Sequence, residues 1–183
     1  MKKVLLLLLS AVLVNSLFSQ SVVDSHNGRK IPTKGTFRVF VVFAEVTGDP
    51  HYNTTPAGWP AGQMPNNPAN YIDINTNYQS FIGRYYDEIS FGELKVLGDY
   101  HPQLVQIPYN SFTSADQSNA RIFEKLSDLC NGQQIVTARG LNFPEDFDLW
   151  DLSPAQGQVK HNTKDGAIDC IMIYWRINSK WAQ

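Results

Sequence analysis

A nearly continuous run of apolar side chains, from Phe37 to Val46, constrains the fold more than any other segment. Its sequence, FRVFVVFAEV, is rich in the β-branched and aromatic residues that strands favour. A strand with one solvated face alternates apolar and polar residues, whereas this run is apolar at nearly every position. We therefore expect a central strand buried on both faces, ending at the turn sequence Thr47-Gly48-Asp49-Pro50.

Two segments further along the chain are predicted to form helices. In the first, Thr76 and Gln79 form a capping-box pattern, and Gly92 is a typical helix stop. In the second, Ser114 and Gln117 repeat that pattern. The apolar positions at helical spacing are Tyr78, Phe81, Ile82, Tyr85, Tyr86 and Ile89 in the first segment, and Ala120, Phe123, Leu126, Leu129 and Cys130 in the second. Each helix should pack its apolar face against the sheet.

Further strands are expected between and after these helices. Residues 93–97 alternate like a half-buried strand, residues 104–108 are a candidate neighbour, and residues 167–177 form a second strongly apolar run. Strands interleaved with helices indicate an α/β fold. We expect a mixed twisted sheet packed with helices.

The N-terminus has the pattern of a secretory signal peptide. Lys2 and Lys3 precede an apolar run that is too short to cross a membrane comfortably, and small residues follow it before Gln20. We expect a signal peptide at residues 1–19, a flexible segment at residues 20–35 and one domain at residues 36–183, in a secreted, periplasmic or extracellular protein. Without residues 1–19 the chain has 13 basic and 17 acidic side chains, a charge too weak and mixed to suggest nucleic acid. The expected partners include no nucleic acid, and no membrane span is expected.

The segment from Phe81 to Tyr100, FIGRYYDEISFGELKVLGDY, carries a pattern beyond its periodicity. Its signature residues are Tyr85, Tyr86, Glu88, Ser90, Gly92 and Leu94. This YY-x-E-x-S-x-G-x-L pattern resembles the secreted zinc peptidases of the immune-inhibitor-A type, the M6 group. The resemblance spans roughly Phe37 to Ile177 and implies the N-terminal part of the catalytic domain, with a sheet like the upper subdomain of a zincin-type metallopeptidase.

The zinc site that the resemblance implies is missing from these 183 residues. No HExxH occurs, and His26, His51, His101 and His161 stand singly in the sequence. The expectation is therefore a fragment that ends before HExxH and is inactive as given. In the full-length protein, zinc-bound water would hydrolyse an extracellular protein or peptide substrate. The alternative is a non-catalytic secreted module that binds an extracellular protein or polysaccharide.

Acidic residues near the end of the chain suggest a different metal. Carboxylates converging from loops suit calcium, which takes six to eight oxygen ligands. The candidate ligands are Asp148, Asp151, Asp165 and Asp169. In the M6-like family a D-x-D-G-D-G-x-x-D segment precedes an apolar strand, and Asp165, Gly166 and Asp169 match its last part. About thirteen additional residues, 152–164, interrupt the pattern here, so a turn with solvated acids remains the alternative.

Two other features leave alternatives open. The proline-rich loop around Trp59 either forms one wall of a substrate cleft or uses its aromatic residues to anchor itself to its own domain. Cys130 and Cys170 either form a disulfide, which an exported protein permits, or remain two buried thiols.

Overall fold

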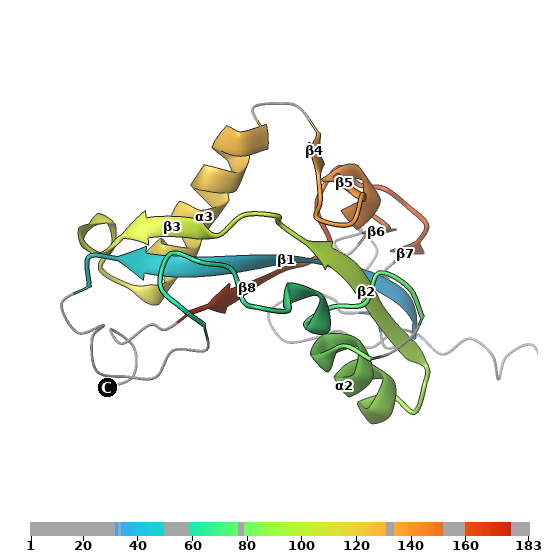
Figure 1. Cartoon of the computed structure of the whole chain (residues 1–183). Helices are drawn as coiled ribbons and strands as arrows, with labels where there is room; N and C mark the ends of the chain where they lie inside the picture. Colours follow the sequence, from blue (N-terminus) through green and yellow to red (C-terminus); the bar gives the residue numbers. More distant parts are fainter. Residues whose placement is uncertain are drawn as a thin grey trace, which may run out of the picture.

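The computed structural model describes residues 32, 34–49, 59–76, 79–130, 134–151 and 160–176. The predicted signal peptide at residues 1–19, and residues 20–31 of the predicted flexible segment, lie outside these described residues. Gly35, which the sequence placed in that segment, already belongs to the first strand. The elements in chain order (Figure 1) are β1 (Gly35–Thr47), η2 (Pro68–Asn70), α2 (Phe81–Ile89), β2 (Leu94–Tyr100), β3 (Val105–Pro108), η3 (Tyr109–Ser111), α3 (Ala115–Cys130), β4 (Ile135–Val136), β5 (Asn142–Phe143), η4 (Glu145–Phe147), β6 (Trp150–Asp151), β7 (Lys160–His161) and β8 (Ile171–Trp175).

Strand β1 is the centre of a four-stranded sheet. It pairs with β2 along its first half, with β3 along its last four residues and with β8 in between. Phe40 pairs with both β2 and β8, and Ala44 with both β3 and β8. Because the two partners of one residue lie on opposite edges, β8 lies on the edge of β1 opposite β2 and β3. The central strand expected from the sequence is confirmed.

The α/β class is also confirmed, but the pairing differs from the mixed sheet that was expected. Every strand pair in the four-stranded sheet is parallel. Within the described residues, antiparallel pairing occurs only in the separate sheets β4–β5 and β6–β7. Residues 105–108 pair with β1 rather than with β2, because the chain continues past β2 along the same edge, where the His101 N–H donates to the Val41 carbonyl at 2.8 Å.

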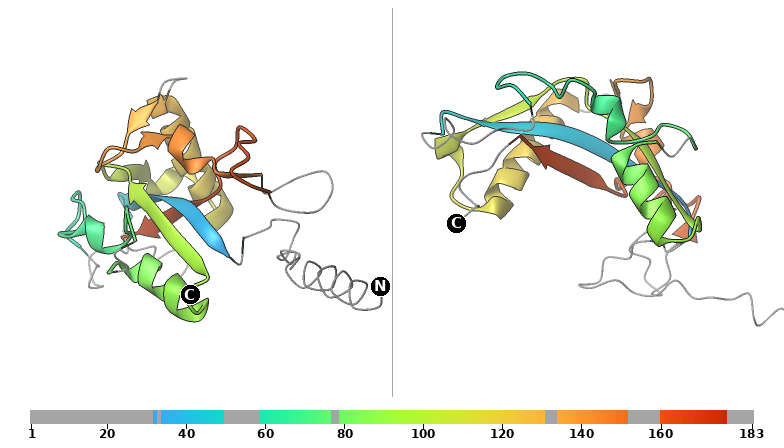
Figure 2. Two further views of the ribbon diagram at one scale, coloured as in Figure 1. Left: turned by 90° about the vertical axis from the view of Figure 1, so that its right-hand side faces the viewer. Right: turned by 60° about the horizontal axis from the view of Figure 1, so that its bottom comes forward.

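Alternate residues of β1 face two separate cores. Phe37, Val39, Val41 and Phe43 pack in one core with Ile82 of α2. Phe40, Val42, Ala44 and Val46 pack in the other with Ile122 and Leu126 of α3. The left view of Figure 2 accordingly shows β1 between the two helices. Side chains that alternate along a strand point to opposite faces, so an uninterrupted apolar run serves both cores at once.

Helix α2 begins at Phe81, four residues later than a cap at Thr76 predicts. Ser80 is the N-cap: its Oγ accepts the Gly83 N–H at 3.0 Å, and Asp73 accepts the Ser80 N–H at 3.0 Å. A Cβ at Gly83 would lie 2.5 Å from Asp73 Oδ2 and 3.3 Å from the Val96 carbonyl oxygen. The start at Thr76 is therefore wrong, because Asp73 fixes the helix entrance through a contact that the local pattern does not contain.

The end of α2 agrees with the prediction. Gly92 has φ +79°, in the left-handed region, and its N–H donates to the Asp87 carbonyl at 2.8 Å. Such a bond closes a helix by satisfying a carbonyl that lacks an intrahelical partner. Phe91, just before it, also has a positive φ, +54°.

Helix α3 begins as predicted, since the Ser114 Oγ accepts the Gln117 N–H at 3.3 Å. Its buried apolar residues include Ile122 and Leu126, whereas Phe123 and Leu129 are exposed. The predicted apolar face of α3 is therefore wrong at Ala120, Phe123 and Leu129, because α3 approaches the sheet along a different stripe. That of α2 is wrong in the same way at Phe81, Tyr85 and Ile89, which are exposed. No helix among the described residues combines the length and apolarity that a membrane crossing requires.

Cys130 and Cys170 are both free. Cys130 packs beside the α3 core and Cys170 beside the α2 core, so the sheet separates the two side chains. The two cysteines therefore remain separate thiols and form no disulfide with each other.

Candidate functional site

The residues of the M6-like signature shape the connection from α2 to β2. Glu88 forms an ion pair with Arg84 at 2.7 Å on the exposed side of the helix. Ser90 accepts the Leu94 N–H at 2.9 Å, and Gly92 provides the left-handed turn. Tyr86 is half-buried, and this burial raises the pKa of its phenol. Within the described residues, the signature thus forms a helix, a turn and a strand start rather than a catalytic cluster.

The predicted calcium ligands lie on two neighbouring segments that bind each other's backbone. Both oxygens of Asp148 accept N–H groups from the other segment, one from Asp165 at 3.1 Å and one from Gly166 at 3.0 Å. Asp169 accepts from Leu149 at 2.9 Å and from Trp150 at 3.2 Å. The two carboxylates therefore form a reciprocal clasp between residues 148–150 and residues 165–169.

The clasp concentrates negative charge. Partial burial raises the pKa of Asp169 to about 6, the two backbone N–H groups oppose that shift, and the nearby carboxylates of Asp148 and Asp165 add to it. No basic side chain is among these causes. A carboxyl in such a place gives up its proton reluctantly, because its charged form is poorly solvated and lies close to like charges.

The expected calcium site does not assemble in the part of the chain that the structure describes. There, no three histidine, cysteine or acidic side chains converge as a metal site requires. Asp148, Asp165 and Asp169 lie close enough to influence one another, whereas Asp151 lies on β6, opposite Lys160 of β7. Calcium binding by Asp148, Asp151, Asp165 and Asp169 therefore stays a prediction from the sequence.

A buried polar cluster, which sequence reasoning missed, centres on Asp99 of β2. Asp99 is fully buried and accepts from the Arg139 backbone N–H at 2.7 Å, from the Arg139 Nε at 2.8 Å and from the Thr137 hydroxyl. Arg139 also donates to the carbonyls of Ile72, at 2.8 Å, and Gly98, at 3.0 Å. Since Asp99 and Arg139 lie forty residues apart, no local pattern could have indicated their pairing. The cluster joins β2 to the turn before β5.

Of the four histidines, the structure describes the side chain of His101 alone. His26 and His51 lie outside the described residues. His101 is buried, and its Nδ1 lies 2.8 Å from the Gln103 carbonyl oxygen. Burial lowers the pKa of its imidazole. With one ring nitrogen held by the loop after β2, His101 acts as a structural residue of that loop.

The loop around Trp59 is anchored to its own domain. Trp59 is buried and lies edge-on to Phe43, with ring centroids 5.8 Å apart. Its carbonyl accepts from Arg176 Nε at 2.7 Å, and Glu45 accepts the Gly62 N–H at 2.7 Å. The described part of this loop therefore follows the anchoring alternative rather than the cleft-wall alternative.

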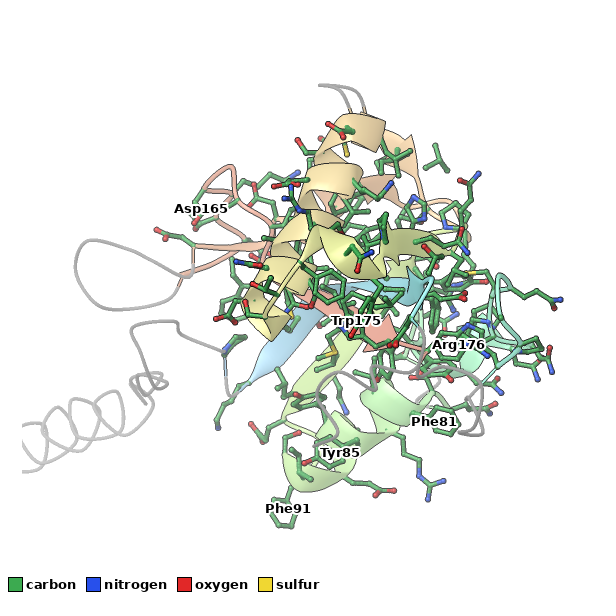
Figure 3. The ribbon with its side chains drawn as sticks, turned by 90° about the vertical axis from the view of Figure 1, so that its left-hand side faces the viewer. Phe81, Tyr85, Phe91, Asp165, Trp175 and Arg176 are labelled. Carbon is green, nitrogen blue, oxygen red and sulfur yellow. The ribbon has the colours of Figure 1, made fainter. Side chains whose placement is uncertain are left out.

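Two surface features remain as candidate sites. An apolar pocket of about 550 Å³ lies between the second half of α3 and the residues around β5 and β8, lined by Phe123, Leu126, Cys130, Phe143, Ile168 and Ile171, among others. The second is a row of exposed apolar residues on and beyond α2, three of which are labelled in Figure 3. Comparisons of this chain with protein-family models, with curated proteins and with solved structures found no match.

Proposed function

We propose that this chain forms the scaffold part of a secreted zinc-dependent endopeptidase of the M6 type. The observation that carries the proposal is the sequence signature, which occupies a well-defined helix, turn and strand beside the central strand β1. Ser90 and Gly92, two of its positions, make contacts that fix the turn. The signature residues therefore have a structural role in this turn, as expected of a motif that belongs to a scaffold.

The described residues do not fit a zinc site. Their histidine, cysteine and acidic side chains form no group able to hold a metal, and the 183 residues contain no HExxH. Three protein ligands and an open position for water are the usual requirement for catalytic zinc. Peptide-bond hydrolysis would therefore depend on residues outside this sequence, and this chain would supply the sheet on which they fold.

The proposal is tested by reading the gene beyond the codon for Gln183. We expect an in-frame HExxH, and we expect the extended protein to hydrolyse casein in a reaction that a zinc chelator stops. The matched control is the present chain, which should bind no zinc in equilibrium dialysis and leave casein intact. A stop codon directly after Gln183, or chelator-sensitive hydrolysis by this chain alone, would refute the proposal.

A non-catalytic binding module is the second candidate, and the apolar pocket beside α3 favours it. Its volume of about 550 Å³ lies in the range of ligand sites, and its lining is mostly apolar. Such a site would accept a bulky apolar side chain of an extracellular protein.

The pocket can be tested with a peptide that carries a single tryptophan. We expect saturable binding that Ser127→Trp abolishes, because Ser127 lines the pocket. Glu124→Trp is the matched control, since Glu124 is an exposed residue of α3 that does not line it. Equal binding to both variants would rule out the pocket as the site.

A further inference from the structure

Helix α2 carries an unusually apolar exposed edge. Phe81, Tyr85 and Ile89 follow one another at intervals of four residues and are 65%, 58% and 54% exposed, and Phe91 beyond the helix is 95% exposed. Residues four apart on a helix lie on the same side, so Phe81, Tyr85 and Ile89 form a single row. This row, together with Phe91 just past the helix end, is defined here as the α2 stripe. Figure 3 shows Phe81 and Tyr85 of this row along α2 and Phe91 just beyond its end. The Phe81 ring also lies edge-on to Tyr71, with ring centroids 5.5 Å apart.

Phe91 is an unfavourable residue for its position in the turn after α2. Its φ of +54° lies in the left-handed region, which bulky side chains rarely adopt. Asn or Gly would fit that turn with less strain, and a polar residue would be better solvated at 95% exposure. The residue found there extends the stripe past the end of the helix.

The charges beside the stripe indicate what covers it. Arg84 and Glu88 lie along its solvent flank, one turn apart, and form an exposed ion pair. When two copies of α2 pack side by side in antiparallel directions, Arg84 of one copy comes next to Glu88 of the other, and the reverse contact forms by symmetry. A parallel arrangement would place like charges together, which is unfavourable. The flank is thus complementary to itself in the antiparallel direction only.

We propose that two copies of this chain associate through their α2 stripes in an antiparallel, two-fold arrangement. Tyr85 then lies near the symmetry axis, and Phe91 of each copy reaches Phe81 of the other. One surface patch serves both subunits, as a closed two-fold dimer requires. The shared edge joins the two domains through helices and leaves both sheets unchanged.

The area available sets the strength of this association. Four large side chains exposed to this extent offer roughly 500 Å² per copy, since a buried aromatic residue covers 150 to 250 Å². The total of roughly 1,000 Å² is near the lower limit for a specific interface. We therefore expect a dissociation constant on the order of 10 µM, with monomers dominating in dilute solution.

Sedimentation equilibrium of the purified chain over a wide range of concentrations tests the proposal. We expect a monomer–dimer equilibrium that Phe91→Ser weakens about tenfold, because a fully exposed ring loses its place in the interface. Phe91 supports no core, so this variant should keep the parental melting temperature. Leu129→Ser, which removes an exposed apolar residue from α3, is the matched control and should leave the equilibrium unchanged. A chain that stays monomeric up to about 1 mM, or dimers that Phe91→Ser does not weaken, would overturn the proposal.

Charge exchange then tests the antiparallel arrangement. Arg84→Glu gives a purely acidic flank and Glu88→Arg a purely basic one, so each variant alone should dimerise about tenfold more weakly. Mixed together, the two variants should form a heterodimer at least as readily as the parent dimerises. Arg121→Glu, which alters an exposed ion pair on α3, is the control and should have no effect. If mixing the two flank variants restores no association, the antiparallel interface is wrong.

Discussion

Asp99 and Asp169 are both acidic residues withdrawn from solvent, yet the fold compensates them in different ways. Asp99 is fully buried and faces Arg139, whose guanidinium and backbone N–H both donate to it. Asp169 accepts only backbone N–H groups and lies close to two more carboxylates, so its pKa rises to about 6. A cation therefore compensates the first carboxylate, whereas burial and neighbouring carboxylates raise the pKa of the second.

The largest effect is expected from removing the cation of the Asp99 cluster. Arg139→Met leaves a buried carboxylate without its counter-charge, and we expect the free energy of unfolding to fall by about 3–5 kcal/mol. Urea denaturation followed by circular dichroism measures it. Arg121→Met removes an exposed pair on α3 and should cost less than about 1 kcal/mol. Equal losses in the two variants would show that Arg139 compensates no buried charge.

Breaking the clasp should cost less. Asp148→Ala leaves the N–H groups of Asp165 and Gly166 without their acceptor, so we expect a loss of about 1–2 kcal/mol. Hydrogen exchange at those two amides should accelerate at the same time. Asp165→Ala removes one local acceptor, for the Ala167 N–H, and should have the smaller effect. A larger loss from Asp165→Ala would mean that the clasp is assigned to the wrong carboxylate.

The pH dependence of the clasp follows from Asp169. Its folded-state pKa of about 6 exceeds the ordinary 3.8, so the folded state binds this proton more tightly. Its contribution stabilises the fold below about pH 4 and is lost as the pH rises through 6, by about 1 kcal/mol once solvent screening is allowed for. Carbon NMR of the Asp169 carboxyl should give the midpoint directly. A midpoint near 4 would show that Asp169 titrates like an ordinary exposed carboxyl and would contradict this prediction.

Calcium should have the smallest effect. The clasp carboxylates already accept backbone N–H groups, and no group of three acidic, histidine or cysteine side chains among the described residues could hold a cation. We therefore expect 5 mM calcium to shift the melting temperature by less than about 1 °C. Differential scanning calorimetry with and without calcium measures this. A rise of several degrees that Asp165→Ala abolishes would instead support the calcium site predicted from the sequence.

The sequence predicted the features that depend on local patterns and missed those that depend on contacts with other segments. The central strand, the Ser114 cap and the Gly92 stop are local patterns, and the structure confirms all three. The start of α2 was predicted wrongly because Asp73, seven residues before Ser80 and outside the capping pattern, determines it. The buried faces of α2 and α3 were predicted wrongly in part, because periodicity identifies an apolar stripe but not the direction in which the helix packs on the sheet.

The candidate sites depended even more on the fold. The acidic residues near the end of the chain were found from sequence, but whether they meet a metal or a backbone amide depends on how residues 148–150 and 165–169 lie side by side. The pairing of Asp99 with Arg139 spans forty residues and leaves no pattern in either segment. The sequence alone cannot show which of these carboxylates binds a metal, a backbone amide or an arginine.

By itself, the sequence determined that a strand buried on both faces lies at the centre of an α/β fold, because a β-branched and aromatic run that is apolar at nearly every position leaves water only when both faces of its strand are covered. The tertiary structure alone decided that this sheet is parallel, which residues face each core and which acids are compensated. Those choices depend on contacts between segments far apart in the chain. The free energies of these contacts depend on the burial of the groups and the distances between them, and a local sequence pattern contains neither.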